Sequence, residues 1–163
     1  MQRLEPLFDS EDEYRAFVLR HRSARMKKKD PGECSGNCFL GLDIGSTTSK
    51  AALIDEEGNL LFSCYGNNCG KPLETAAGML LSVYSVLNPD AVIASSAVTG
   101  YGEALIKTAF SCDAGIVETV AHSTGAGFFL PGADLILDIG GQDMKCIKVK
   151  NGVIDSVLLN EAC

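Results

Sequence analysis

Two short segments of the chain carry the same arrangement of chemically capable residues. Residues 43–50 and residues 138–145 each begin with an aspartate, place a glycine two positions later and end with a lysine. Each segment follows one apolar stretch and precedes another, a pattern typical of a strand, a tight turn and a returning strand. The sequence therefore predicts an internal repeat built around a turn.

The composition of these turns suits a phosphate ligand. Glycine lets backbone N–H groups approach an anion without a Cβ in the way, and neighbouring hydroxyl groups add donors. The expected phosphate-binding residues are Gly45, Ser46, Thr47 and Thr48 in the first turn and Gly140 and Gly141 in the second. The alternative is an ordinary β-turn in which Asp and Thr satisfy local backbone groups. The occurrence of the same turn twice favours binding.

The charged residues of the repeat suggest how a phosphate would be handled. A carboxylate at Asp43 or Asp138 can hold a hydrated Mg²⁺ beside the phosphates, or orient water for attack on the terminal one. Lys50 and Lys145 could offset phosphate charge, or could equally lie on the exposed face of the returning strand. The glycine and lysine at residues 70–71 lack the spacing and the hydroxyl residue of a P-loop. We therefore predict a different phosphate-binding architecture.

The elements that must position these turns follow from the hydrophobic periodicity. We expect a helix over residues 8–28, broken at residues 30–32, so that residues 1–31 form a basic helical segment and linker. Beyond residue 39 the pattern predicts strands at 39–44, 50–54 and 60–65, a helix over 73–87, a buried strand at 91–96, a helix over 102–110, a short strand near residue 116, a helix over 119–129, and strands at 135–139, 144–149 and 153–159. An Asn-Gly turn at residues 151–152 joins the last two strands.

Charge and cysteine content exclude several functions. Residues 1–29 hold eight Lys and Arg against five acidic residues, whereas residues 30–163 hold six against sixteen. Such an acidic body disfavours nucleic-acid binding, and the basic run at residues 20–29 is more typical of a solvated helix end or linker than of an RNA or lipid site. The chain shows neither an apolar stretch of membrane-spanning length nor a secretory signal. Its 7 irregularly spaced cysteines favour reduced thiols or metal ligands in a reducing compartment over a disulfide framework. We expect a cytoplasmic protein that binds neither nucleic acid nor membrane.

At this point the sequence resembles a known group of proteins. Two Asp-x-Gly turns around a half-domain of three strands, helix, strand and helix resemble the superfamily of actin, sugar kinases and heat-shock chaperone ATPases. Five ordered motifs are similar to those of the BadF/BadG/BcrA/BcrD-type ATPases, at residues 42–50, 98–102, 118–122, 137–145 and 159–163. The implied fold is an α/β, ribonuclease H-like half-domain with a mixed sheet and flanking helices. Residues 39–163 would form the first lobe and the first strands of a truncated second lobe.

The resemblance also implies a function. This family includes activators of 2-hydroxyacyl-CoA dehydratases and ATPase subunits of benzoyl-CoA reductases. It implies a homodimeric ATPase that uses ATP hydrolysis to drive a low-potential electron into a dehydratase or reductase partner through a shared [4Fe-4S] cluster. Cys163 matches the first cluster cysteine of the family, and thiolate is the ligand that such clusters need. The second cluster cysteine and the adenosine-binding motif would lie beyond residue 163, so we expect this fragment to be inactive by itself.

Further residues carry alternatives. Gln142 could orient water and Asp143 could reach Mg²⁺, while Glu118 is a candidate for an outer position near the metal. His122 lies in an apolar stretch, which favours a core histidine over a catalytic base. Residues 99–102 could line the interlobe cleft or form only a turn. Four cysteines have spacings that a zinc ion could use, namely Cys34, Cys38, Cys64 and Cys69. The more common alternative is that these thiols are buried and bind no metal.

Two other functions remain open for the same residues. The first is a sugar or acyl-substrate kinase on the same fold, against which the Asn-Glu-Ala-Cys context of Cys163 counts. The second is a non-catalytic module that serves assembly inside a long fusion protein. Loss of ATP turnover with both turns unchanged would favour this second alternative.

Overall fold

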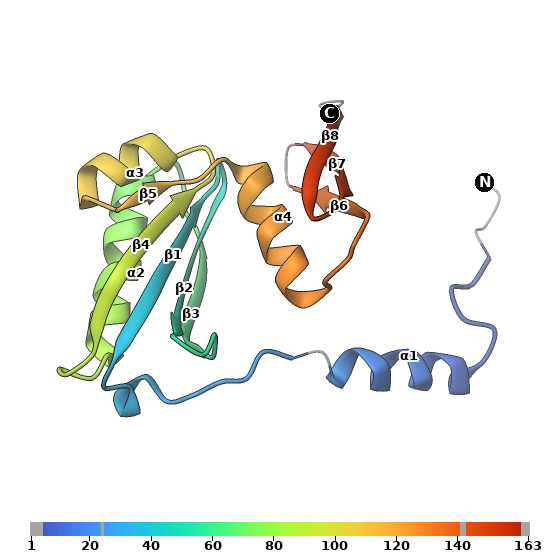
Figure 1. The fold of residues 1–163 in the computed structure, drawn as a ribbon, viewed down its shortest axis with the longest axis horizontal. Helices are drawn as coiled ribbons and strands as arrows, with labels where there is room; N and C mark the ends of the chain where they lie inside the picture. Colours follow the sequence, from blue (N-terminus) through green and yellow to red (C-terminus); the bar gives the residue numbers. More distant parts are fainter. Residues whose placement is uncertain (1–4, 24, 141–142, 161–163) are drawn as a thin grey trace.

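The chain folds around two β-sheets (Figure 1). The computed structural model describes residues 5–23, 25–140 and 143–160. The strands of the first sheet are β1 (Asn37–Ile44), β2 (Thr48–Asp55), β3 (Leu60–Asn67), β4 (Val92–Thr99) and β5 (Ala114–Gly115). Those of the second are β6 (Leu135–Ile139), β7 (Met144–Lys150) and β8 (Val153–Asn160). The strand orders are β3-β2-β1-β4-β5 and β6-β7-β8.

The helices lie on both sides of the first sheet. They are α1 (Glu11–Ser23), α2 (Pro72–Val86), α3 (Glu103–Phe110) and α4 (Glu118–Phe129), with a short 3₁₀ turn, η1, at Pro31–Glu33. Helices α2 and α3 cover one face of the first sheet, whereas α4 lies on the opposite side and leads into the second sheet (Figure 1). Helix α1 lies apart from both sheets. The first sheet is therefore open on the side that faces α4.

The first sheet is mixed, as the resemblance implied. β1 and β2 pair antiparallel, as do β2 and β3, because short turns join them. β4 runs parallel to β1, and β5 runs parallel to β4, because helices form these crossovers. This topology brings the turn after β1 and the loop after β4 to the same end of the sheet.

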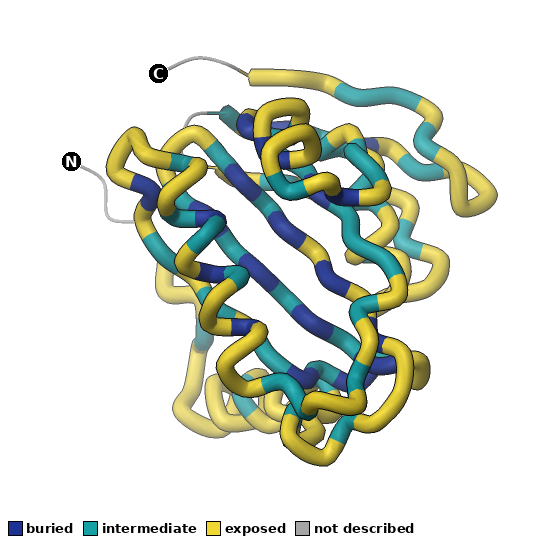
Figure 2. The backbone as a smooth tube through the Cα atoms, turned by 90° about the vertical axis from the view of Figure 1, so that its left-hand side faces the viewer, coloured by how far each residue is buried: buried dark blue, intermediate teal, exposed yellow. Residues whose placement is uncertain are grey.

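The core lies between the first sheet and helices α2 and α3. Alternate residues of β1 are buried, with Leu40, Leu42 and Ile44 at most 5% exposed. Figure 2 shows this alternation along the central strands. Helix α2 buries Ala76, Met79 and Val83, whose spacing places them on one helical face. The side chains of the other alternate residues of β1, which include Asp43, consequently point toward α4.

A groove of about 580 Å³ runs along the open face of the first sheet. Its floor includes Gly41 and Ala52, while Ala121 of α4 lines it from the other side. Asp43 and Lys50 line it as well. Near the far end of α4, the ring of Phe128 lies in contact distance of the position that a Cβ would occupy at Gly58. Helix α4 therefore runs along the open face and ends beside the turn between β2 and β3.

The second sheet buries less apolar surface than the first. Ile147 is fully buried, but Leu135, Leu137 and Ile139 of β6 are more than half exposed on one face. The predicted hairpin between β7 and β8 is confirmed, because Asn151 and Gly152 both adopt positive φ, at 53° and 76°. No helix within the described ranges is both long and apolar enough to cross a bilayer.

Most predicted elements agree with the structure to within a few residues. Two differ in extent or burial. The first helix begins at Glu11 and ends at Ser23, so it is shorter than predicted. The strand predicted as buried, β4, is mostly half-buried, and only Val98 is fully covered. The reason is that its outer neighbour, β5, has only two residues and pairs with Ala97 and Val98 alone.

Candidate active site

The two copies of the repeat form the same hairpin. In the first, the N–H of Gly45 donates to the carbonyl oxygen of Thr48 over 2.9 Å. In the second, the N–H of Gly140 donates to the carbonyl oxygen of Asp143, also over 2.9 Å. A Cβ on either glycine would lie only 3.1 Å from an oxygen of that partner residue. The repeat seen in the sequence is therefore a repeat of backbone geometry.

The charged residues of the repeat also occupy equivalent places. Asp43 lies directly opposite Lys50 in the pairing of β1 with β2. Asp138 lies directly opposite Lys145 in the pairing of β6 with β7. Cross-strand partners have their side chains on the same face of a sheet. Both lysines consequently lie on the same face of their sheets as the aspartates.

The tip of the first turn offers backbone donors to a ligand. Ser46 and Thr47 are exposed, and within the described part of the chain neither of their N–H groups has a hydrogen-bond partner. The two side-chain hydroxyl oxygens lie 3.5 Å apart. An anion placed here would meet two N–H groups and two hydroxyls, the donor set of a phosphate-binding nest.

Asn68 holds this turn from behind. Its side chain donates from Nδ2 to the carbonyl oxygen of Gly45 over 2.8 Å, and its backbone N–H donates to the carbonyl oxygen of Thr47 over 2.9 Å. Asn68 is 2% exposed. These bonds fix both sides of the turn. Asn68 was not among the predicted site residues, because its only local signal is its place in an Asn-Asn-Cys-Gly turn after a strand.

The loop at residues 99–102 packs directly against the first turn. The N–H of Gly102 donates to the carbonyl oxygen of Ile44 over 2.8 Å. Gly100 has φ of +90°, and a Cβ there would lie 2.6 Å from the Ile44 carbonyl oxygen and 2.8 Å from Oδ1 of Asp43. The backbone can approach the aspartate this closely only because residue 100 is a glycine. This loop is therefore part of the wall around Asp43.

At the first hairpin, one ion pair among the described residues holds the aspartate. Nζ of Lys50 lies 2.8 Å from Oδ2 of Asp43. The lysine side chain is 43% exposed and that of the aspartate 24% exposed. Both groups line the groove beside α4, so a ligand in the groove can reach them.

At the second hairpin the lysine is buried among three carboxylates. Nζ of Lys145 lies 2.8 Å from Oδ2 of Asp143, 3.5 Å from Oε2 of Glu118 and 3.7 Å from Oδ2 of Asp138. Its side chain is only 8% exposed. Burial acts to lower the pKa of Lys145, but the hydrogen bond to Asp143 and the charges of the three carboxylates raise it overall. The ammonium group therefore stays charged and draws β7 and α4 together.

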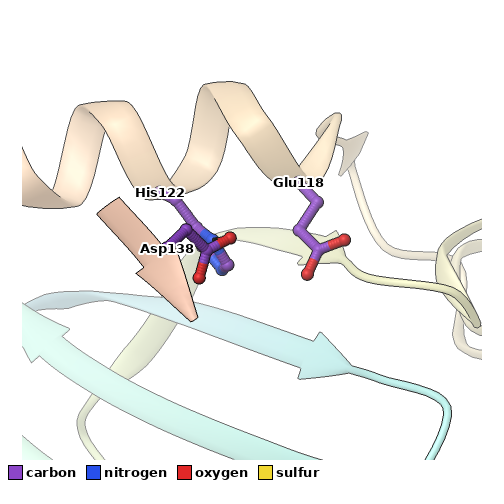
Figure 3. A group of neighbouring side chains, drawn as sticks. All are labelled: Glu118, His122 and Asp138. Atoms are coloured by element: carbon purple, nitrogen blue, oxygen red, sulfur yellow. Dashed lines mark hydrogen bonds and ion pairs between the residues drawn. The ribbon is translucent and has the colours of Figure 1, made fainter. Parts of the chain in front are cut away.

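His122 contacts the aspartate of the second hairpin (Figure 3). Its Nδ1 lies 2.7 Å from Oδ2 of Asp138. The ring is not fully buried, since the side chain is 30% exposed, and the carboxylate of Asp138 satisfies its nitrogen. A carboxylate oxygen can only accept, so the imidazole donates. Since α4 and β6 are separate elements, their approach could not be read from the apolar pattern around His122.

Side chains from α4 and β6 could hold a divalent cation. One ligand atom each from Glu118, His122 and Asp138 lies within 4.8 Å of the other two, and Figure 3 shows the three side chains converging. Both contacts of Asp138 within the described ranges involve Oδ2, which leaves Oδ1 available. Mg²⁺ prefers such oxygen ligands and retains several waters. The residues present thus fit a magnesium ion held through carboxylates, with Lys145 balancing their charge.

Some predicted site residues fall outside the described ranges. Gly141 and Gln142 of the second turn and Cys163 of the expected cluster belong to this group. The four cysteines weighed as a zinc site do not meet in space: among the described residues, the group formed by Glu118, His122 and Asp138 is the one with metal-ligand spacing. Cys38 is buried and Cys64 is half-buried, and burial raises the pKa of both thiols.

The fold is that of the actin-like ATPase and sugar kinase class. Solved structures with this fold include the activator of 2-hydroxyisocaproyl-CoA dehydratase from Clostridium difficile with bound ADPNP, at a TM-score of 0.64 and 30% identity. The match covers 77% of this chain and 46% of that one. This chain thus shares its fold with a protein whose structure was solved with a bound nucleotide analogue.

The chain belongs to the BadF/BadG/BcrA/BcrD ATPase family, whose model matches residues 40–163. It is 33% identical over 128 residues to the 2-hydroxyisocaproyl-CoA dehydratase activator of Clostridioides difficile, covering 76% of this chain and 46% of the relative. It is 28% identical over 127 residues to the (R)-2-hydroxyglutaryl-CoA dehydratase activating ATPase of Acidaminococcus fermentans, covering 76% and 47%. The chain spans about half the length of these relatives. The resemblance to this family is therefore confirmed, and the kinase alternative is not favoured.

Proposed function

We propose that this chain supplies the phosphate-binding and Mg²⁺-binding part of an ATPase that activates a 2-hydroxyacyl-CoA dehydratase or a related reductase. The observation that carries the proposal is the equivalence of the two hairpins. Gly45 and Gly140 close the same turn, and each turn lies beside an aspartate paired with a lysine. Family membership supports the choice of ATP as the ligand.

Each residue has a role in this proposal. The N–H groups and hydroxyls of Ser46 and Thr47 bind phosphate oxygens, with Gly45 and Thr48 shaping that turn. Asp43 and Asp138 hold Mg²⁺ and orient the water that attacks the terminal phosphorus, so that ADP leaves as the new P–O bond forms. Lys50 offsets phosphate charge. At the second turn, Gly140 and Gly141 bind phosphate, Gln142 orients water and Asp143 helps to hold the cation.

The proposed coupling of ATP hydrolysis to electron transfer involves residues outside the described ranges. We propose that ATP hydrolysis drives an electron from a [4Fe-4S] cluster into the partner enzyme, with Cys163 as one cluster ligand and two copies of the protein sharing the cluster. The residues at 39–163 would form the first ATPase lobe and the beginning of the second, preceded by a linker at 1–31. A cluster of this kind requires a reducing compartment, which for this chain would be the cytoplasm.

The experiment is ATP hydrolysis by the full-length protein and by its Asp43→Ala variant. We expect the variant to lose hydrolysis while its thermal unfolding stays close to that of the wild type, because Asp43 is a half-exposed residue beside a groove. The matched control is Asp90→Ala, which removes an exposed aspartate from the turn between α2 and β4. Unchanged hydrolysis in Asp43→Ala would overturn the assignment of Asp43.

A further inference from the structure

The two hairpins differ in which side chain supplies the short hydrogen bond to the aspartate. At the first hairpin, Nζ of Lys50 lies 2.8 Å from Oδ2 of Asp43. At the second, the equivalent lysine lies 3.7 Å from Oδ2 of Asp138. The short contact to that oxygen comes instead from Nδ1 of His122, at 2.7 Å. A histidine on α4 thus takes the place that a cross-strand lysine has in the first copy.

The reason for this exchange lies in the second turn itself. Asp143 stands where the first turn has Thr48, and its carboxylate holds Lys145 at 2.8 Å. Lys145 also lies 3.5 Å from Glu118. The shortest contact of the Lys145 ammonium is thus to Asp143, and its contact to Asp138 is longer, at 3.7 Å. Asp138 is therefore oriented by another donor, and His122 is the residue placed to act as one.

The geometry of α4 accounts for that placement. Glu118 and His122 are four residues apart on the helix and lie on the same face. Ala121, beside His122, lines the same groove as Asp43. The helix therefore borders both hairpins, and the side chains of Glu118 and His122 reach toward Asp138 of β6 (Figure 3).

We infer that His122 is a positioning residue for Asp138. Through its Nδ1–H it holds Oδ2 of the carboxylate, and it thereby leaves Oδ1 directed to the Mg²⁺ that accompanies the nucleotide. This inference rests on the proposed function, since it assigns a role at the same site. Outer partners of a metal-binding carboxylate commonly change metal affinity or activity by about 10-fold to 100-fold when removed. A direct metal-ligand role for His122 through Nε2, which keeps its lone pair when Nδ1 carries the proton, is the competing assignment, and the asparagine variant described below distinguishes the two.

The test compares His122→Ala, His122→Asn and His122→Gln in the 163-residue chain. The amide nitrogen of asparagine is attached to Cγ, as Nδ1 is, whereas that of glutamine lies one bond further out. We measure the Mg²⁺ concentration that gives half-maximal ADPNP binding by calorimetry. His122→Ala and His122→Gln should raise it by about 10-fold to 100-fold, and His122→Asn should restore most of the loss. His21→Ala is the matched control, because Nδ1 of His21 also has a helix-borne partner, the carbonyl oxygen of Phe17 at 2.8 Å.

Three outcomes would overturn the inference. The first is an unchanged Mg²⁺ requirement in His122→Ala, with unfolding as in the wild type. The second is an equal loss in the alanine and asparagine variants, which would indicate a general packing role. The third is loss of Mn²⁺ or Zn²⁺ binding in His122→Asn, since asparagine cannot replace imidazole as a metal ligand, and this result would make His122 a ligand.

A measurement without nucleotide separates this inference from the proposed function. If the full-length wild-type protein binds no ADPNP at any Mg²⁺ concentration, the proposed function fails. The ring ¹⁵N resonances of His122 then still report the hydrogen bond. They should show a protonated Nδ1 in the wild type and lose that signature in Asp138→Ala, whereas identical ring resonances in the two proteins would contradict the contact on which the inference depends.

Discussion

The side-chain nitrogen of Asn68 donates to the carbonyl oxygen of Gly45 over 2.8 Å, although 23 residues separate them in the sequence. This bond ties the end of β3 to the turn between β1 and β2. It makes the shape of that turn depend on a residue that no ligand needs to touch. The first prediction follows from this contact.

Asn68→Ala should loosen the first turn. The change removes the buried donor from the Gly45 carbonyl, and a buried oxygen left without a partner costs about 1 to 3 kcal/mol. We expect a loss of this size in the free energy of unfolding, measured by urea denaturation. The control is Asn67→Ala, which alters the exposed neighbour of Asn68 and should change stability by less than about 1 kcal/mol. Equal effects of the two substitutions would contradict the account.

Gly100→Ala should disturb Asp43 through the backbone. A Cβ at residue 100 would approach the carbonyl oxygen of Ile44 to 2.6 Å, and the positive φ of +90° adds strain. A side chain in the left-handed region costs about 1 to 2 kcal/mol before any clash. Thermal unfolding should show a clear loss of stability. Gly78→Ala is the matched control, because an added Cβ on α2 meets open space and should stabilise the helix by about 0.5 to 1 kcal/mol. A neutral Gly100→Ala would be incompatible with the described packing.

The two lysines of the repeat should differ in their contribution to stability. Lys145→Met leaves three carboxylates facing one another without their cation. Removing one partner of a fully buried pair costs about 3 to 5 kcal/mol. We expect about 1 to 3 kcal/mol, since the partner side chains are 18% to 40% exposed and solvent screens them. Lys50→Met removes one partly exposed pair and should cost less than about 1 kcal/mol. Urea denaturation measures both, and a larger loss in Lys50→Met would reverse the predicted order.

Stability should fall in acid because of Asp55. Burial acts to raise the pKa of Asp55. Hydrogen bonds from Asn59 and Lys29 outweigh this effect and hold that pKa well below its ordinary value of 3.8. A carboxylate whose pKa is lower in the folded state stabilises the fold above its unfolded pKa, and this contribution is lost as the pH falls below about 4. Asp55→Asn should be less stable at pH 7 and should lose less stability between pH 5 and pH 3 than the wild type. Parallel pH profiles for the two proteins would argue against this contribution.

The sequence predicted the hairpins because the residues that determine each hairpin are close together in the chain. The spacing of aspartate, glycine and lysine within residues 43–50 and 138–145 fixes a turn and a cross-strand pair, and an alternating apolar pattern fixes the strands around them. The partners from other elements were not predictable in the same way. Asn68 and His122 act on turns 23 and 16 residues away, and no periodicity encodes those contacts. They depend on how β3 and α4 pack beside the hairpins.

The central claim is that both hairpins contact one Mg²⁺-bound nucleotide. The most direct measurement is a ¹H–¹⁵N spectrum of the 163-residue chain during titration with ADPNP and Mg²⁺, for the wild type, Asp43→Asn and Asp138→Asn, with Asp155→Asn of β8 as the control. We predict Mg²⁺-dependent shifts of the amides of Ser46, Thr47 and Asp143, which each of the two site variants reduces and the control retains. Shifts confined to other parts of the chain, or equal shifts in all four proteins, would contradict the claim.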